Sequence, residues 1–330
     1  MLKLTAELPI SVIIPVLNDA ASLTRCIASL RTASGAAAEP EIVVVDNGST
    51  DKSLARAQEA GAVTIVAPDL SVSALRNRGA RCASGAMLAF VDADHEVFPG
   101  WFEAAVEVLA DEHVGAVGAT CLPPSAGTWV QRMYGRLRGR SAGRADVEWL
   151  GSGNLVVRRT AFDQVAGFDE TLRVCEDVDF CHRLRLAGWR LVSDDRLKNV
   201  HHGDPSTLKD LFRGELWRGR DNLRVSLRYL TLRGLPSLAI PLIDLTAMVA
   251  LLLGLALWRL SGLWVAAGMI GVIIGLAVLR ALRMIAADGP RGFVAVVQAL
   301  LVAGTYDTAR ALALVVRAKH RRAVEAGPER

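Results

Sequence analysis

Acidic side chains follow two apolar, strand-like runs of this sequence and recur as a pair further along it. The run MLAFV at residues 87–91 leads straight into Asp92 and Asp94, and the run EIVVVD at 41–46 also ends in an aspartate. A further acidic pair lies at 176–177. Ligands of open α/β sheets bind where the strands end, so these carboxylates are expected to share one sheet edge. Carboxylates there can hold a divalent cation against phosphate oxygens, because hard cations prefer oxygen ligands.

The elements that must position these acids alternate between strands and helices. Strands are predicted for the apolar runs at 10–15, 42–45, 63–66, 87–91 and 114–119. Helices are predicted from about residue 20, between 50 and 61, and over 74–82 and 99–110. The β-branched run at 42–45 suits a parallel strand that is buried on both faces. This alternation predicts a mostly parallel, doubly wound α/β sheet.

The pattern loosens over residues 120–150 and then becomes regular again. Two prolines and the basic stretch RMYGRLRGRSAGR predict a loop or flexible helix over the site. A strand is predicted at 155–157, and the later segment CEDVDFCHRLRLAGWRL predicts a helix with Glu176, Asp177 and Asp179 near its start. Acidic residues in the first turn of a helix are stabilised by the helix dipole. This pattern alone therefore favours a structural role and a catalytic role for Glu176 and Asp177 equally.

Composition excludes some classes of protein and indicates two regions. A net charge of +4 without a basic block in the first region gives no sign of nucleic-acid binding. The five cysteines lack metal-type spacing and read as reduced thiols. Residues 1–9 are too short and polar to contain a secretory signal, so the N-terminal domain is expected in the cytosol. We predict a globular α/β domain over 1–232 and an α-helical membrane region over 233–330.

Five segments are arranged as in a known protein family. They are SVIIPVLND, EIVVVDNGSTD, ALRNRGARCASGAMLAFVDAD, GSGNLVVRRTAFDQVAGFDE and CEDVDFCHRLRLAGW, and they cover about residues 10–200. In order and spacing they resemble the family 2 glycosyltransferases, which have the GT-A fold, a Rossmann-like fold of nucleotide-diphospho-sugar transferases. The resemblance implies an enzyme that transfers a sugar from a nucleotide-sugar donor to an acceptor hydroxyl, with inversion and with bound Mn²⁺ or Mg²⁺.

The resemblance also implies roles in donor binding. The residues that match the family's donor-binding positions are Pro15, Asp46, Asn47, Arg76, Asn77, Asp92 and Asp94. The first three match positions that line the base and ribose pocket. Arg76 and Asn77 fall on the family's A-R-N-R-G motif near the diphosphate, although arginines on such helices are as often simply solvated. Asp92 is expected to face the ribose or donor sugar, and Asp94 to bind the cation that stabilises the leaving diphosphate.

Catalytic and further metal-binding roles follow from the same resemblance. Asp177 is expected to be the general base that takes the acceptor hydroxyl's proton as that oxygen attacks the anomeric carbon, with Glu176 in support. His201 is the favoured histidine ligand of the metal, since a neutral imidazole suits Mn²⁺. His202 or a purely structural histidine are the alternatives.

Two other segments leave alternatives open. Gly153 and Asn154 match a segment that closes over the donor sugar or acceptor, but they equally suit a tight turn into a strand. The helix DLFRGELWRGRDNLRV lacks the Q-x-x-R-W motif of polymer-making members, which argues against processive polymerisation. Its Trp217, Arg218 and Arg220 can contact a phosphate or anchor the helix at lipid headgroups.

The C-terminal region contains apolar runs of membrane-spanning length. The runs at 236–257 and 263–285 are each long enough to cross a hydrocarbon core, and a buried helix pair of a soluble protein is the alternative. Arg280 and Arg283 end the second run, so a hairpin joined by the linker RLSGL, with both ends in the cytosol, fits the positive-inside rule. The run at 292–316 is interrupted by polar residues and followed by a basic tail. We expect it to lie in, or re-enter, the cytosolic interface.

The sequence therefore favours a multi-pass protein of the cell membrane with its catalytic domain on the cytosolic face. We expect a metal-dependent, inverting glycosyltransferase that acts on a lipid-linked or membrane-associated acceptor in cell-envelope polysaccharide or glycolipid assembly. Membrane lipid is the other expected partner. A sugar-phosphate nucleotidyltransferase is disfavoured, because PVLNDAAS lacks a G-x-x-x-R loop. A catalytically inactive glycosyltransferase-like scaffold or sugar-binding subunit is the alternative.

Overall fold

The computed structural model describes residues 10–34, 40–139, 143–229, 235–256, 260–286 and 292–316. Contacts group them into two compact units. Unit 1 contains the described residues up to 122 and from 143 to 203, and unit 2 contains 123–139 and those from 204 to 316. The domain boundary predicted between residues 232 and 233 follows the change in hydropathy along the sequence, whereas the two units are defined by contacts. That domain boundary stays a prediction.

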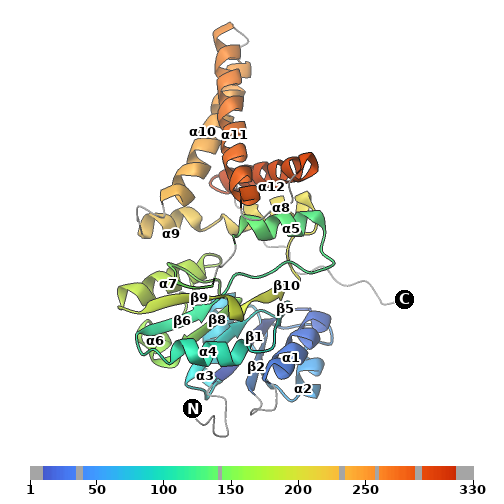
Figure 1. Cartoon of the computed structure of the whole chain (residues 1–330), viewed down its shortest axis with the longest axis vertical. Helices are drawn as coiled ribbons and strands as arrows, with labels where there is room; N and C mark the ends of the chain where they lie inside the picture. The colour runs from blue at the N-terminus through green and yellow to red at the C-terminus, as the bar shows by residue number, and fades with distance from the viewer. Residues whose placement is uncertain are drawn as a thin grey trace, which may run out of the picture. The chain divides into compact units, whose positions relative to one another are not determined.

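Unit 1 is built on a large central sheet (Figure 1). This sheet has eight strands in the order β3-β2-β1-β4-β8-β6-β9-β7. Its strands are β1 (Ile10–Val16), β2 (Glu41–Asp46), β3 (Val63–Val66), β4 (Met87–Val91), β6 (Val114–Gly118), β7 (Arg144–Asp146), β8 (Asn154–Arg158) and β9 (Arg190–Asp194). A separate two-stranded sheet pairs β5 (His95–Val97) with β10 (Asn199–His201). The helices are α1 (Ala20–Ser34), α2 (Ser53–Glu59), α3 (Val72–Cys82), α4 (Trp101–Leu109), α6 (Arg159–Gln164), α7 (Glu176–Leu186) and the 3₁₀ helix η1 (Asp195–Leu197).

The large sheet is parallel in one half and mixed in the other. β1 pairs in parallel with β2 and β4, and β2 pairs in parallel with β3, as the alternation predicts. β8 runs antiparallel between β4 and β6, and β7 is antiparallel to β9. β6 pairs in parallel with β9, so six of the eight strands run in one direction, as the expectation of a mostly parallel sheet requires, and only β8 and β7 run in the other. Among the described residues between β6 and β8, no helix belongs to unit 1, whereas a parallel connection would need a crossover helix against the sheet.

The core of unit 1 consists of two apolar clusters. Val44 of β2 belongs to the cluster that includes residues of α1 and α4, whereas Val43 and Val45 belong to the cluster with residues of α3 and α7. All three valines are fully buried, which explains why the run is continuously apolar. The loops after β2 and β4 therefore emerge from a closely packed sheet.

Unit 2 is helical. Its helices are α5 (Trp129–Leu137), α8 (Leu208–Arg218), α9 (Asn222–Arg228), α10 (Leu235–Ala256), α11 (Leu260–Ala286) and α12 (Phe293–Leu312). Part of the segment expected as a loop or flexible helix is the ordered helix α5, which begins with a capping box between Thr128 and Gln131. The threonine and the glutamine three positions later are the sequence signal for this helix start.

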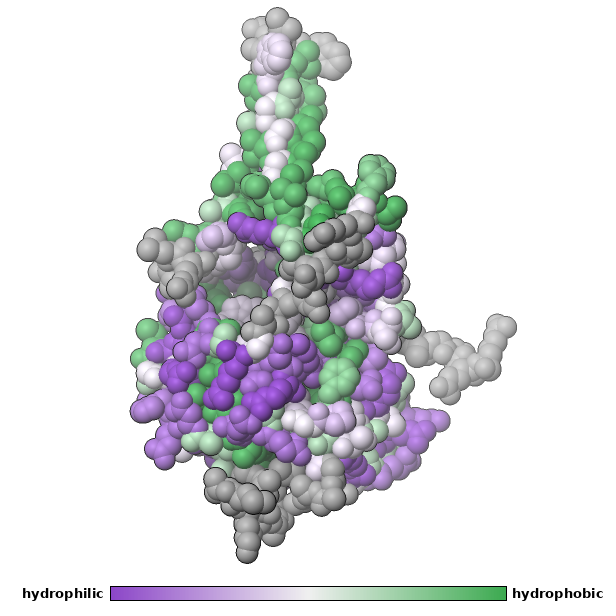
Figure 2. Space-filling view, in the orientation of Figure 1, coloured by the Kyte–Doolittle hydropathy of each residue, from purple (hydrophilic) through white to green (hydrophobic). Residues whose placement is uncertain are grey.

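Helices α10 and α11 of unit 2 lie side by side and are apolar on their surfaces (Figures 1 and 2). Leu235–Ala256 and Gly262–Ala286 are long and apolar enough to cross a membrane, as predicted. Most of the predicted linker RLSGL is already part of α11. Residues 1–9, Arg259 and the basic tail at 317–322 lie outside the described residues.

Buried charges connect α8 with α5 and α12 within unit 2. Glu215 is fully buried, accepts a hydrogen bond from the Tyr134 hydroxyl (2.7 Å) and pairs with Arg218 (3.0 Å) and Arg310 (2.8 Å). Burial favours a raised pKa for Glu215, but the two guanidinium groups outweigh it and lower the pKa. Arg218, expected at a phosphate or at lipid headgroups, is thus held inside this network.

Candidate active site

The carboxyl ends of β1, β2 and β4 lie next to one another because these strands are parallel neighbours. Asp46 is the last residue of β2 and is in register with Val16 of β1, one residue after Pro15. Asp92 and Asp94 directly follow β4. The sheet therefore brings these residues, selected from the sequence, to one edge.

The two polar residues at the end of β2 have different hydrogen bonds. Oδ1 of Asp46 accepts from the backbone N–H groups of Gly48 (2.8 Å) and Ser49 (2.7 Å). Oδ2 is buried and has no hydrogen-bond partner among the described residues. Asn47 instead binds the backbone of Leu70, accepting from its N–H (3.1 Å) and donating to its carbonyl (3.3 Å). Asp46 thus offers a buried acceptor to a ligand, whereas Asn47 ties two loops together.

Arg76 of α3 joins two of the acidic clusters. Its side chain is buried, Nη2 lies 2.7 Å from Oδ1 of Asp92, and Nη1 lies 2.8 Å from Oε1 of Glu176. Burial alone would lower the pKa of Arg76, but these carboxylates raise it. Ser152 Oγ also donates to Glu176 Oε1 (3.1 Å). Arg76 is therefore not a solvated surface residue, and the carboxylate of Glu176 is held by an ion pair and a hydrogen bond.

Asp177 stands beside this ion-pair system in the first turn of α7. Burial, reinforced by the charge of Glu176, raises the pKa of Asp177 to about 7, although its own backbone, the N–H of Val178 and Arg76 act in the opposite direction. A carboxyl group with such a pKa accepts protons near neutral pH, as a general base requires. The structure thus separates the acidic pair into an ion-paired Glu176 and a titratable Asp177.

We expect the reaction rate at this site to rise with pH through about 7, because Asp177 accepts a proton only when it is ionised. Glu176→Gln should move this rising limb to lower pH, since the charge of Glu176 helps to raise the pKa of Asp177. Turnover measured from pH 5 to 9 checks both expectations. A rate that falls through pH 7, or a limb that shifts upward in Glu176→Gln, would contradict the assignment.

Asp94, His95 and His201 form a cluster whose potential ligand atoms all lie within 4.8 Å of one another. His201 Nε2 is 3.2 Å from Asp94 Oδ2, and His95 Nε2 is 3.8 Å from Asp94 Oδ1. Burial favours a raised pKa for Asp94, but the hydrogen bond from His201 and the two imidazoles lower it overall. One carboxylate and two imidazoles are a donor set that suits Mn²⁺. The predicted Asp94 and His201 thus meet, and His95 is an addition.

Two residues near this cluster, His202 and Asn154, are held by hydrogen bonds to other parts of the protein. Nε2 of His202 lies 2.9 Å from Oε2 of Glu96, so the structure favours His201 over His202 as a ligand. Asn154 is buried, accepts from Trp101 Nε1 (3.0 Å) and donates to the Leu197 carbonyl (2.7 Å). Its contacts fit the alternative of a turn entering a strand.

Residues 11–165 match the model of glycosyl transferase family 2. Glycosyltransferase AglE of Haloferax volcanii is 30% identical over 224 residues, which cover 64% of this chain and 73% of that protein. This chain belongs to glycosyl transferase family 2. A pre-mycofactocin glycosyltransferase of Mycobacterium tuberculosis is 27% identical over 296 residues; the match covers 83% of this chain but spans only 58% of the length of that relative.

Among solved structures, the family 2 chain is similar to mannosyltransferase PcManGT from Pyrobaculum calidifontis, which was determined with GDP-Man and Mn²⁺. The TM-score is 0.52 at 15% sequence identity, and the likeness covers 91% of this chain and 87% of that one. At this identity the likeness concerns the fold. The predicted GT-A fold is confirmed.

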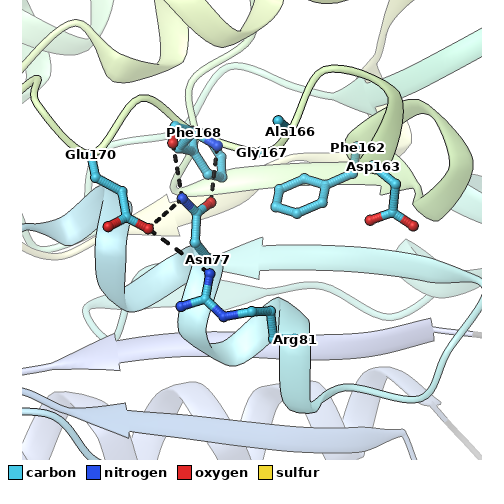
Figure 3. Close-up of a pocket in the computed structure, with 8 residues that line it drawn as sticks. All are labelled: Asn77, Arg81, Phe162, Asp163, Ala166, Gly167, Phe168 and Glu170. Carbon is cyan, nitrogen blue, oxygen red and sulfur yellow. Dashed lines mark hydrogen bonds and ion pairs between the residues drawn. The ribbon is translucent and has the colours of Figure 1, made fainter.

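Asn77 of this family 2 protein lines a pocket of about 410 Å³ that includes none of Asp94, His95 and His201 (Figure 3). Its amide donates to the Phe168 carbonyl and to Glu170 Oε1 (2.9 Å each) and accepts from the Phe168 N–H (2.9 Å). These bonds fasten α3 to the loop after α6. Arg76 and Asn77, adjacent in the motif, therefore face different surroundings.

Gly153 leaves space that Asp92 and His95 occupy. A Cβ atom on Gly153 would lie 2.5 Å from Asp92 Oδ2 and 2.9 Å from His95 Cε1, whereas one on Gly151 would make only an ordinary contact with Trp149 (3.6 Å). We expect Gly153→Ala to lower the free energy of unfolding by about 1–3 kcal/mol through overpacking. Gly151→Ala, the matched control, should change it by less than about 0.5 kcal/mol. Urea titrations compare the two, and equal effects would contradict this contact.

Proposed function

We propose that this family 2 protein is an inverting glycosyltransferase that requires a divalent cation and moves a sugar from a nucleotide-sugar to an acceptor hydroxyl. The observation that carries the proposal is the first turn of α7, where Glu176 is ion-paired with Arg76 (2.8 Å) and burial raises the pKa of the adjacent Asp177. Arg76 links Glu176 to Asp92 at the sheet edge where Asp94 and the two histidines lie. A proton acceptor and a cation site thus belong to one connected arrangement.

In this proposal one set of residues binds the donor and another transfers the proton. Asp46 accepts a hydrogen bond from the nucleoside with Oδ2, and Asp92, which is ion-paired with Arg76, faces the ribose or donor sugar. Pro15, Asn47 and Asn77 shape the walls and loops around the donor. Asp94 and His201 would hold the cation, and a bound cation would supply positive charge that stabilises the leaving diphosphate.

Asp177 performs the proton transfer in this proposal. It takes the proton of the acceptor hydroxyl while that oxygen forms a bond to the anomeric carbon. The bond between this carbon and the diphosphate oxygen breaks, and the diphosphate leaves with the electron pair. A single displacement of this kind inverts the anomeric configuration. Glu176 supports the base, because its negative charge helps to raise the pKa of Asp177.

The acceptor is proposed to be lipid-linked or otherwise held at a membrane. The exposed apolar residues of α10 and α11, among them Leu252, Leu253 and Trp264, favour insertion of this hairpin into lipid. A relative named N-acetylglucosaminyl-diphospho-decaprenol L-rhamnosyltransferase, from Mycobacterium tuberculosis, is 46% identical over 65 residues, 19% of this chain. Its name describes a lipid-linked acceptor, which is the class proposed here for cell-envelope polysaccharide or glycolipid assembly.

The hairpin is proposed to have both ends in the cytosol, with unit 1 on that side. Arg280 and Arg283 near the end of α11 support this orientation by the positive-inside rule. α12 exposes Val294, Val297 and Leu301 on one side and buries Ala299, Val302 and Ala303 on the other, a division between two faces that suits a helix lying in the interface.

Nucleoside diphosphate release tests the proposal. The detergent-purified chain is incubated with UDP-, GDP- and dTDP-sugars, with Mn²⁺ or a chelator, and with membrane lipid extract as acceptor. We expect Mn²⁺-dependent release from one class of donor that increases with the extract. Donor binding without release under every condition would favour the alternative of an inactive scaffold or sugar-binding subunit.

A further inference from the structure

His95 and Asn199 form a buried pair on the small sheet of unit 1. β5 and β10 are antiparallel with His95 opposite His201, and the two imidazole rings lie 4.5 Å apart. His95 is 4% exposed and Asn199 is fully buried. Nδ1 of His95 lies 2.6 Å from the carboxamide nitrogen of Asn199, on the side of the ring opposite to Asp94. The imidazole of His95 therefore lies between the carboxylate of Asp94 and the buried amide of Asn199.

The orientation of this amide determines which ring nitrogen of His95 carries a proton. With the amide nitrogen towards the ring, Nδ1 must accept, and the neutral imidazole then carries its proton on Nε2. A half-turn of the carboxamide places the oxygen there without changing the shape of the side chain. Nδ1–H then donates, and Nε2 keeps its lone pair. Oδ1 of Asn199 is buried and has no hydrogen-bond partner among the described residues, so it is available for this bond.

We propose that Asn199 is a positioning residue that presents His95 as a second histidine ligand of the divalent cation. Its carboxamide oxygen accepts Nδ1–H, and Nε2 of His95 faces the cation together with Asp94 and His201. The inference rests on the proposed function only in so far as that function requires a cation. Histidine ligands of metals commonly donate their other N–H to such a partner.

Mn²⁺ affinity of the full, detergent-purified chain tests the proposal without measuring turnover. Electron paramagnetic resonance titration with Mn²⁺ alone should show about 10–100-fold weaker binding in Asn199→Leu, which removes the acceptor. Asn199→Asp keeps an oxygen acceptor and should bind Mn²⁺ about as well as the wild type. His202→Ala, a neighbouring histidine that contacts Glu96, is the matched control and should leave the affinity unchanged.

Pulsed electron paramagnetic resonance of the Mn²⁺-loaded chain should detect two coordinating histidine nitrogens in the wild type and in Asn199→Asp, and one in His95→Ala. One nitrogen in the wild type, no Mn²⁺ binding at all, or equal losses in Asn199→Asp and Asn199→Leu would overturn the inference. If Asn199→Leu does not fold, Asn199→Ala, which also removes the acceptor, takes its place in the comparison with Asn199→Asp. Two nitrogens without sugar transfer would refute only the proposed function, and Mn²⁺-dependent transfer with one nitrogen would refute only this inference.

Discussion

Replacing Asp177 with asparagine should reduce turnover by about 10²–10⁴-fold while donor binding stays nearly intact. Asparagine keeps the size of the side chain but cannot accept the acceptor's proton at neutral pH. The loss should appear in kcat, because proton transfer occurs only as the new bond forms. Turnover is measured by nucleoside diphosphate release and donor affinity by isothermal titration calorimetry. The rising limb of the pH profile should disappear in the same variant.

Asp179→Asn is the matched control for this prediction. Asp179 lies in the same first turn of α7 and is fully buried, where its carboxylate pairs with Arg183 (2.8 Å). If acids in this turn served only the helix dipole, both substitutions would lower stability modestly and neither would abolish turnover. We expect a lower melting temperature in Asp179→Asn with turnover largely kept. Equal turnover in the two variants would refute the role of Asp177 as base.

Replacing Arg76 with methionine should lower the free energy of unfolding by about 3–5 kcal/mol, because it leaves Asp92 and Glu176 without their buried counter-charge. Arg76 also acts to lower the pKa of Asp177, so the remaining activity should rise at higher pH than in the wild type. Urea titration followed by tryptophan fluorescence measures the stability, and turnover against pH measures the second effect.

Arg81→Met is the control on the same helix. Arg81 is exposed and lies 4.0 Å from Glu170, a contact of the kind that contributes little to stability. We expect its substitution to change the free energy of unfolding by less than about 0.5 kcal/mol. Comparable losses in Arg76→Met and Arg81→Met would mean that the buried ion pairs do not hold α3 and α7 together.

Local patterns predicted the elements and the acids at their ends. The apolar run of β2 predicted a strand buried on both faces, and Asp46 stands at its carboxyl end in the structure. Hydropathy predicted α10 and α11 to within a few residues. Strands and helices depend mainly on residues that are close together in the sequence, so the periodicity of apolar residues predicts them.

Long-range pairing could not be predicted in the same way. Arg76 and Glu176 are separated by 100 positions, and only the folded sheet brings α3 to α7. The antiparallel direction of β8 depends equally on the path between distant strands. His95 was missed although it directly follows the paired aspartates, because its role depends on β5 pairing with β10. An imidazole beside a D-x-D motif was the available signal.

The anomeric configuration of the first-formed product tests the central claim most directly. With the donor identified by nucleoside diphosphate release, the transferred sugar is examined by nuclear magnetic resonance before the product can equilibrate. A single displacement assisted by Asp177 predicts that the configuration is inverted relative to the donor. A product that retains the donor's configuration would contradict the account, because a single attack from the side opposite the leaving diphosphate cannot preserve that configuration.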